Sequence, residues 1–176
     1  MSGKLSGLGK GFFAIGIERS KTPANVGTLM RSAVCFGASY VFIVGGRYPR
    51  QCSDTVKSWQ QIPLFEYEDI DDFNEHRPLD VPLIGVELAD NARSLETFSH
   101  PDRALYLLGP EDGSLSKAAQ GYCQSLVRFN SRFCLNVAAA GSVVLYDRTA
   151  KASSPLMAER PVRAYSAPNM PKGNNG

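Results

Sequence analysis

The chain has 176 residues, a length that suits one compact domain with a sizeable hydrophobic core. Hydrophobic residues make up 43% of it, which excludes a disordered chain. No apolar run reaches about 18 residues, which argues against a membrane-spanning helix. Its net charge is only +2, yet residues 61–102 hold eleven acidic residues against two basic ones, whereas the remainder holds seventeen basic against six acidic. A basic face of this kind suits contact with phosphates, and an acidic surface that is merely solvated accounts for the pattern about equally well.

The first part of the chain contains three predicted strands and one predicted helix. Residues 1–11 lack the apolar core of a signal peptide and are predicted to form a flexible lead-in. Short apolar segments at 12–17, 40–46 and 62–67 predict strands. Between the first two, residues 26–36 predict a helix with Asn25 as its N-cap and Gly37 as its stop.

The alternation continues in the second part. Residues 81–88, 103–109 and 125–129 predict three more strands, and residues 116–122 a helix. The last helix is predicted over residues 135–146, with the polar Asn136 one position inside its start. From residue 150 the chain is rich in Pro, Ser, Asn and basic residues, which predicts an extended basic tail over 150–176 and a single domain over 12–149.

Strands that are apolar throughout and alternate with helices predict an α/β fold, with a parallel sheet that helices cover on both faces. Ligands bind beyond the carboxyl ends of the strands in such sheets. The loops that contain Gly45, Glu87 and Gly109 are therefore the places where we expect a site.

Three segments contain residues suited to chemistry. In residues 21–38, Asn25 and Arg31 lie on one predicted helix, and they are either functional or an ordinary cap and an exposed charge. Residues 105–116 run from a strand into a Gly-Pro-Glu-Asp-Gly turn that lacks both common phosphate-loop patterns. The acidic Glu111 and Asp112 favour a neutral or cationic ligand there, unless the segment is only a tight turn. In residues 132–148, a row of small residues follows Asn136, which allows close approach of a ligand or simply of another helix.

The cysteine and histidine residues do not match a metal-site or disulfide pattern. The four cysteines have no CxxC or finger spacing, and the chain has only two histidines. We therefore expect no metal and a reducing, cytoplasmic environment.

These three segments, in this order, resemble the SpoU/TrmH branch of the SPOUT RNA methyltransferases. The first motif, N-x-G-x-x-x-R-x-x-x-x-F-G, is matched at Asn25, Gly27, Arg31, Phe36 and Gly37. The second, a G-x-E loop that often ends in G-L-S, is matched at Gly109, Glu111, Leu115 and Ser116, with Ser114 in place of the usual glycine. The third, commonly S-L-N-V-S, is matched at Leu135, Asn136 and Val137, with Cys134 and Ala138 in place of the two serines.

The resemblance implies an α/β-knot, in which the C-terminal part of the domain forms a deep trefoil knot, and a homodimer with active sites at the interface. It also implies transfer of a methyl group from S-adenosyl-L-methionine to a ribose 2′-hydroxyl of RNA, with tRNA favoured over rRNA. The catalytic residues it implies are Arg31, Asn25, Glu111 and Asn136. The cofactor-binding residues it implies are Val86, Glu87, Leu88, Leu108, Gly109, Phe129, Leu135 and Ala140.

Two roles stay open within this reading. Arg31 is either the base that removes the 2′-proton or, since arginine stays protonated, a guanidinium that binds phosphate and favours the developing alkoxide, with Glu111 and Asn136 to orient it. The RNA surface is expected after the second strand, where Trp59 is either a base-stacking platform or partly buried core. The residues of that surface are Arg47, Tyr48, Arg50, Lys57 and Trp59. The alternative function is a catalytically inactive knotted RNA-binding protein.

Overall fold

The computed structural model describes residues 12–49 and 58–152. The predicted lead-in and nearly all of the predicted basic tail lie outside these residues. No helix in the described part of the chain is long and apolar enough to cross a membrane.

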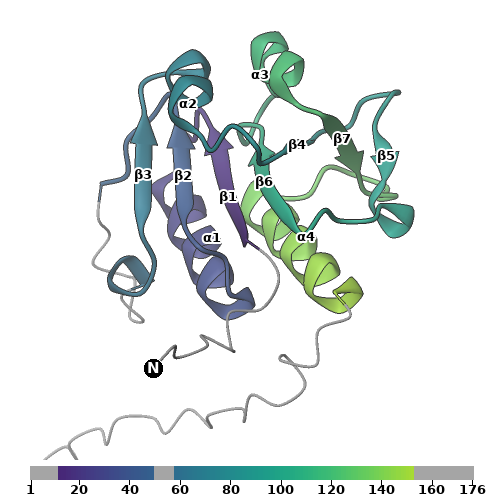
Figure 1. Ribbon diagram of the computed structural model, residues 1–176, viewed down its shortest axis with the longest axis horizontal. Coiled ribbons are helices and arrows are strands. Elements are labelled where there is room, and N and C mark those ends of the chain that lie inside the picture. The colour runs from purple at the N-terminus through teal and green to yellow at the C-terminus, as the bar shows by residue number, and fades with distance from the viewer. Residues whose placement is uncertain (1–11, 50–57, 153–176) are drawn as a thin grey trace, which may run out of the picture.

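A seven-stranded parallel sheet forms the centre of the described structure (Figure 1). The strands are β1 (Phe12–Glu18), β2 (Val41–Val44), β3 (Leu64–Tyr67), β4 (Leu83–Val86), β5 (Arg93–Ser94), β6 (Arg103–Leu108) and β7 (Ser125–Arg128). Their order in the sheet is β3-β2-β1-β6-β4-β7-β5, and every pair of neighbours is parallel. The predicted parallel α/β fold is therefore confirmed, whereas the trefoil knot stays a prediction.

Helices cover both faces of the sheet. The helices α1 (Pro23–Phe36) and α4 (Val137–Lys151) lie side by side on one face, while α2 (Ile70–His76) and α3 (Lys117–Tyr122) pack on the other. Two short 3₁₀ turns, η1 (Ser58–Gln60) and η2 (Leu95–Thr97), complete the described elements. Successive residues of a strand point to opposite faces, so the strands β1, β2, β4 and β6, which are buried on both faces, contain nearly continuous apolar runs.

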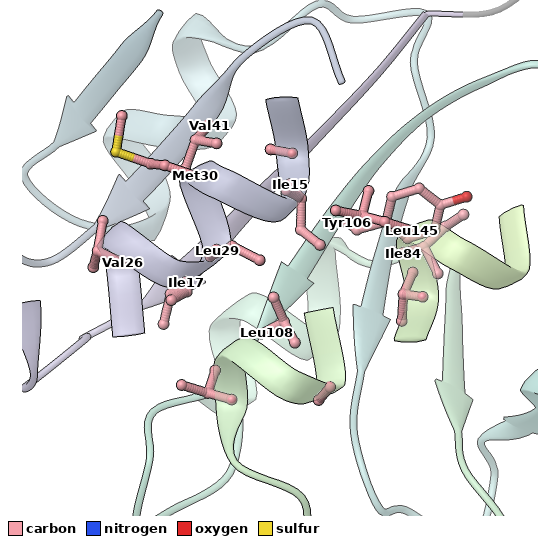
Figure 2. Close-up of a cluster of buried hydrophobic side chains, with 14 of the residues drawn as sticks. Ile15, Ile17, Val26, Leu29, Met30, Val41, Ile84, Tyr106, Leu108 and Leu145 are labelled. Carbon is pink, nitrogen blue, oxygen red and sulfur yellow. The ribbon is translucent and has the colours of Figure 1, made fainter. Parts of the chain in front are cut away.

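The larger core lies between the sheet and the α1/α4 pair. Ile15 and Ile17 of β1 meet Leu29 of α1 and Leu145 of α4 there, and all four are buried (Figure 2). Gly141 of α4 allows the two helices to approach closely, since a Cβ atom at this position would lie 2.4 Å from Leu29 Cδ1. Gly141 thus serves helix packing, which is one of the two readings that the sequence left open for the small residues of α4.

Two predicted helix starts are wrong by a few residues. The helix α1 begins at Pro23, with Thr22 at the N-cap position, so Asn25 lies within the first turn and is not the cap. Proline is common at the first position of a helix because the backbone N–H that it lacks would have no hydrogen-bond partner within the helix. Asn136 lies not inside α4 but at its N-cap, where its side chain accepts hydrogen bonds from the backbone of Ala138 and Ala139.

The predicted ends of the two helices differ in accuracy. Gly37 ends α1 as expected, with a left-handed φ of 78° that suits glycine. The helix α4 continues to Lys151, past the predicted end at residue 146 and two residues into the predicted tail. Arg148 explains the extension, because its guanidinium is buried and donates to the carbonyl oxygens of Pro101 (2.6 Å) and Asp102 (2.7 Å).

Candidate functional site

A cavity of about 400 Å³ opens at the carboxyl ends of β4, β6 and β7. Its lining combines the loops that follow these strands with the first turn of α4. The eight residues predicted to bind a cofactor all line it: Val86, Glu87, Leu88, Leu108, Gly109, Phe129, Leu135 and Ala140. The structure therefore brings together residues from four separate stretches of the sequence into one cavity, at the edge where parallel sheets bind ligands.

The loop over residues 109–116 forms one wall of the cavity and is folded tightly. A Cβ atom at Gly109 would lie 3.0 Å from the backbone nitrogen of Leu115, so only glycine fits without a shift of the loop. The Glu87 carboxylate accepts a hydrogen bond of 2.7 Å from that same nitrogen of Leu115. The loop is thus held by its own close packing at Gly109 and by the side chain of Glu87, which directly follows β4.

Two residues that the sequence reasoning missed brace the same loop. The buried Glu18 carboxylate at the end of β1 accepts a hydrogen bond of 2.8 Å from Ser116 N. Arg19, which has a positive φ of 52°, donates from Nη2 to Ser114 O at 3.1 Å. In the sequence, Glu18 and Arg19 form a charged pair directly after a predicted apolar strand. This pattern indicates where the strand ends, but it does not indicate which loop the two side chains contact.

Glu111 connects the loop to the segment that leads into α1. Its carboxylate accepts hydrogen bonds from Asn25 Nδ2 (2.8 Å) and from the backbone nitrogens of Lys21 and Thr22 (both 3.0 Å). Burial raises the pKa of Glu111, but the hydrogen bonds from Asn25 and the backbone N–H groups outweigh it and lower the pKa from 4.5 to about 2. The side chain is therefore a permanent anion that accepts hydrogen bonds at neutral pH.

The predicted motif residues Asn25, Glu111 and Asn136 form one continuous network. Asn25 donates to Glu111 through Nδ2 and accepts a hydrogen bond of 3.0 Å from Asn136 Nδ2 through Oδ1. Asn136 uses its own Oδ1 to cap α4. The network thereby ties the first turn of α1, the loop after β6 and the start of α4 into one unit.

Arg31 is not part of this network. It lies on an exposed stripe of α1 with Thr28 and Cys35, and it does not line the cavity. Within the described residues it has no hydrogen bond or ion pair to Glu111 or Asn136, so those two side chains do not orient it within one chain. They hold Asn25 instead.

The lining of the cavity combines apolar groups with acidic ones and with one arginine, Arg128. Leu88, Leu108 and Leu135 contribute apolar surface, while Glu111 and Asp112 give the wall of the loop a negative charge. Asp112 also pairs with Lys21 Nζ at 2.7 Å. The described residues contain no group of three or more His, Cys, Asp or Glu side chains placed to hold a metal ion. Such a cavity suits an organic ligand with an apolar body and neutral or cationic polar groups.

The two aromatic residues of the surface predicted to stack RNA bases are buried or partly buried. Tyr48 belongs to the main core, and Trp59 packs partly buried against it, so the reading of Trp59 as core is confirmed. Arg47 is exposed, whereas Arg50 and Lys57 lie outside the described residues. Tyr48 was therefore wrongly predicted as part of an open platform, because the chain after β2 folds back over α1.

Comparison with known proteins connects this geometry to one family. The family model "SpoU rRNA Methylase family" matches residues 13–146. No curated protein sequence matches the chain.

Solved structures extend the comparison. The AdoMet-bound rRNA methyltransferase from Sinorhizobium meliloti is 25% identical with a TM-score of 0.71, over 82% of this chain and 58% of that one. The SpoU methyltransferase AviRb from Streptomyces viridochromogenes, in complex with AdoMet, is 22% identical with a TM-score of 0.69, over 80% and 60%. The chain thus spans less than two thirds of the length of these two. A third structure, described as giving insights into the 2-OH methylation of C/U34 on tRNA, is 17% identical with a TM-score of 0.69, over 81% and 97%.

Proposed function

The chain belongs to the SpoU rRNA methylase family, and on this basis we propose that it transfers a methyl group from S-adenosyl-L-methionine to a ribose 2′-hydroxyl of RNA. The observation that carries the proposal is the cavity, in which all eight residues expected to bind the cofactor meet at the carboxyl edge of the sheet. The hydrogen-bonded trio of Asn25, Glu111 and Asn136 beside it supports the same reading.

The residues of the cavity fit this cofactor. Leu88, Leu108 and Leu135 offer the apolar surface that an adenine ring needs, and the tightly folded loop at Gly109 brings backbone groups close. The acidic wall at Glu111 and Asp112 suits a ligand that carries positive charge. When bound, S-adenosyl-L-methionine supplies a methyl group activated by a sulfonium cation, so the protein has mainly to align it with the hydroxyl.

In this proposal, Arg31 binds the RNA. Its guanidinium would bind the phosphate beside the target ribose through two parallel hydrogen bonds and stabilise negative charge that develops on the 2′-oxygen. Arginine stays protonated at neutral pH, which makes this role chemically easier than that of a general base. Asn25, Glu111 and Asn136 position the loop and the two helix starts around the reacting groups.

A homodimer reconciles Arg31 with a cavity that it does not reach in one chain. The exposed stripe of α1 that carries Arg31 lies next to an exposed stripe of α4 with Val143 and Tyr146. Ser32 Oγ and Ser142 Oγ are 2.8 Å apart, which fixes the two helices side by side. A second copy seated on this pair of helices would cover the apolar side chains and bring Arg31 of one chain toward the site of the other.

The proposal favours tRNA over rRNA as the substrate. The chain covers 97% of the structure described for tRNA methylation but only 58% of the rRNA methyltransferase from S. meliloti. It thus matches the compact relative nearly end to end, while the longer relative has segments that the chain does not match.

Two measurements test the proposed function. Calorimetry with S-adenosyl-L-methionine and S-adenosylhomocysteine should show binding of both, and binding of neither would refute the enzyme. Incubation with labelled cofactor and either unmodified total tRNA or rRNA, followed by mapping of the methylated nucleotide, should place the label on a ribose. RNA binding without any cofactor binding would instead support the inactive RNA-binding protein.

A further inference from the structure

The connection between β7 and α4 presents an aromatic side chain to solvent. Phe133 is 83% exposed, compared with 63% for Tyr146 and 48% for Phe65, the other exposed aromatic residues in the described part of the chain. The segment around it is nevertheless braced: Ser131 Oγ donates to Phe133 O at 2.8 Å, and Asn130 Nδ2 donates to Ser94 Oγ at 3.4 Å. The ring is therefore displayed on a loop of defined shape.

The same connection forms the rim of the cavity. Arg128, Phe129, Ser131, Cys134 and Leu135 all line the cavity, so Phe133 lies within a rim segment over residues 128–135. Phe133 does not itself line the cavity, but it lies between the lining residues Ser131 and Cys134 in the chain, and its ring is exposed. This position distinguishes Phe133 from Phe65, the half-exposed phenylalanine of β3 at the opposite edge of the sheet.

The rim segment is also basic. Arg128 and Arg132 are exposed, form no ion pair within the described residues, and have no acidic residue between them or up to residue 136. The Glu96 carboxylate contacts the segment at Asn130 N, from which it accepts a hydrogen bond of 3.4 Å. Of the acids that line the cavity, Glu111 and Asp112 lie on the loop after β6, while Glu87 follows β4 and is hydrogen-bonded through its backbone to Val127 O at 2.9 Å. The two exposed arginines therefore favour contact of a phosphate chain with the rim segment.

We propose that the rim segment 128–135 is the RNA-contacting edge of the site, where Phe133 stacks on an unpaired base next to the target nucleotide and Arg128 and Arg132 contact the flanking phosphates. Aromatic rings and arginines together are the usual means of holding single-stranded RNA. The inference rests on the proposed function and assigns the RNA contact to a part of the chain other than the one after β2.

A second copy of the chain fits this surface less well than RNA does. In a twofold-symmetric contact the same patch meets itself, so the four arginines of two rim segments would repel one another. The exposed stripe of α4, with Val143 and Tyr146, offers apolar surface that lacks this conflict.

Binding of a fluorescently labelled single-stranded RNA of about 12 nucleotides and of total tRNA to the full chain tests the inference. Phe133→Ala should weaken RNA binding about tenfold, while Phe133→Tyr, which keeps a ring for stacking, should remain within about threefold of the wild type. Arg132→Gln should weaken binding and reduce the slope of log affinity against log salt by about 1. Calorimetry on each variant should show the affinity for S-adenosyl-L-methionine unchanged within about twofold.

Two matched controls lie away from the rim segment. Phe65→Ala removes an exposed ring from the far edge of the sheet, and Arg103→Gln removes a charge at the amino end of β6, so both should bind RNA as the wild type does.

The outcomes separate this inference from the proposed function. If Phe133→Ala and Arg132→Gln bind both RNA and cofactor like the wild type, the rim segment is not the contact, although the enzyme proposal stands. If Phe133→Ala instead changes the sedimentation of the free protein, the ring is a subunit contact and the inference is overturned. Loss of cofactor binding in the wild type would refute the proposed function itself.

Discussion

Asn136 donates a hydrogen bond of 3.0 Å from Nδ2 to Oδ1 of Asn25, a residue 111 positions earlier in the chain. Each of the two amides has a second partner, since Asn25 also donates to Glu111 and Asn136 also caps α4. The pair therefore holds the first turn of α1 against the start of α4. Its geometry leads to predictions that separate its structural part from its catalytic part.

Substitution of Asn136 separates capping from the contact with Asn25. Asn136→Ala should lower the free energy of unfolding by about 1 kcal/mol, because α4 loses its cap. Asn136→Asp keeps an acceptor for the backbone of α4 but no amide donor for Asn25, so stability should stay within about 0.5 kcal/mol while methyl transfer falls. Urea unfolding and labelled-cofactor turnover measure the two effects, and full turnover in the aspartate variant would refute a role for the amide pair.

The Glu111 carboxylate should make stability depend on pH at its acidic end. Its pKa in the folded chain is about 2, below the ordinary 4.5, so its contribution is complete above about pH 4.5 and is lost as the pH falls toward 2. Glu111→Gln should therefore destabilise the protein at pH 7 by about 1 kcal/mol, and the difference from the wild type should shrink on acidification. Unfolding curves of both proteins between pH 7 and pH 3 would reveal a constant difference if the charge is unimportant.

Arg31→Ala should abolish turnover and leave the affinity for S-adenosyl-L-methionine within about tenfold, or roughly 1.4 kcal/mol. The cofactor affinity should be retained because Arg31 does not line the cavity and touches neither Glu111 nor Asn136 within the described chain. Turnover should be lost because the proposed role of Arg31 is to hold the RNA. Arg31→Lys keeps the charge but not the planar fork, so it should recover only part of the turnover. Turnover near the wild-type level in the alanine variant would show that Arg31 is not catalytic.

Two glycine substitutions in helices should have opposite effects on stability. Gly141→Ala places a Cβ atom 2.4 Å from Leu29 Cδ1 in the core and should cost about 1–3 kcal/mol. Gly121→Ala in α3 meets nothing within 4 Å and should stabilise the protein by up to about 1 kcal/mol, since alanine favours the helix. Thermal unfolding of both variants checks the close contact between α1 and α4, which a neutral Gly141→Ala would contradict.

The proposed dimer predicts that charge on α4 is harmful to assembly but not to folding. Val143 is 40% exposed, so Val143→Asp should change the stability of a single chain by no more than about 0.5 kcal/mol. It should nevertheless convert the protein to a monomer and remove turnover. Leu79→Asp, at a leucine that is 88% exposed and lies outside α1 and α4, is the control and should leave assembly intact. Sedimentation of the wild type as a monomer at micromolar concentration would count against the shared site.

Local patterns in the sequence were sufficient to predict most of the elements. Apolar runs gave six of the strand positions because a strand buried on both faces needs apolar residues throughout. Gly37 marked the end of α1 for an equally local reason, the left-handed conformation that follows the helix. The short strand β5 and the helix α2, with its acidic first turn, escaped prediction because their patterns are too short or too polar.

The eight residues of the candidate cavity were predicted by resemblance to a family. The strand pattern predicted only the loops at Glu87 and Gly109, together with the loop at Gly45, which does not line the cavity. Its eight expected residues come from four stretches of sequence, and they meet because β4, β6 and β7 end at the same edge of the sheet. The braces at Glu18 and Arg19 were missed, since the strand order determines that the end of β1 lies beside the loop after β6.

The sequence by itself determined where most of the helices and strands form and which residue types the site would use, because these depend on neighbours along the chain. Only the tertiary structure decided the partners. It turned Asn25 from a helix cap into the link between Glu111 and Asn136, and it buried Tyr48 while leaving Phe133 in solvent. The contacts of Asn25 with Glu111 and Asn136 span 86 and 111 residues, so they follow from the order of strands in the sheet and from no local pattern.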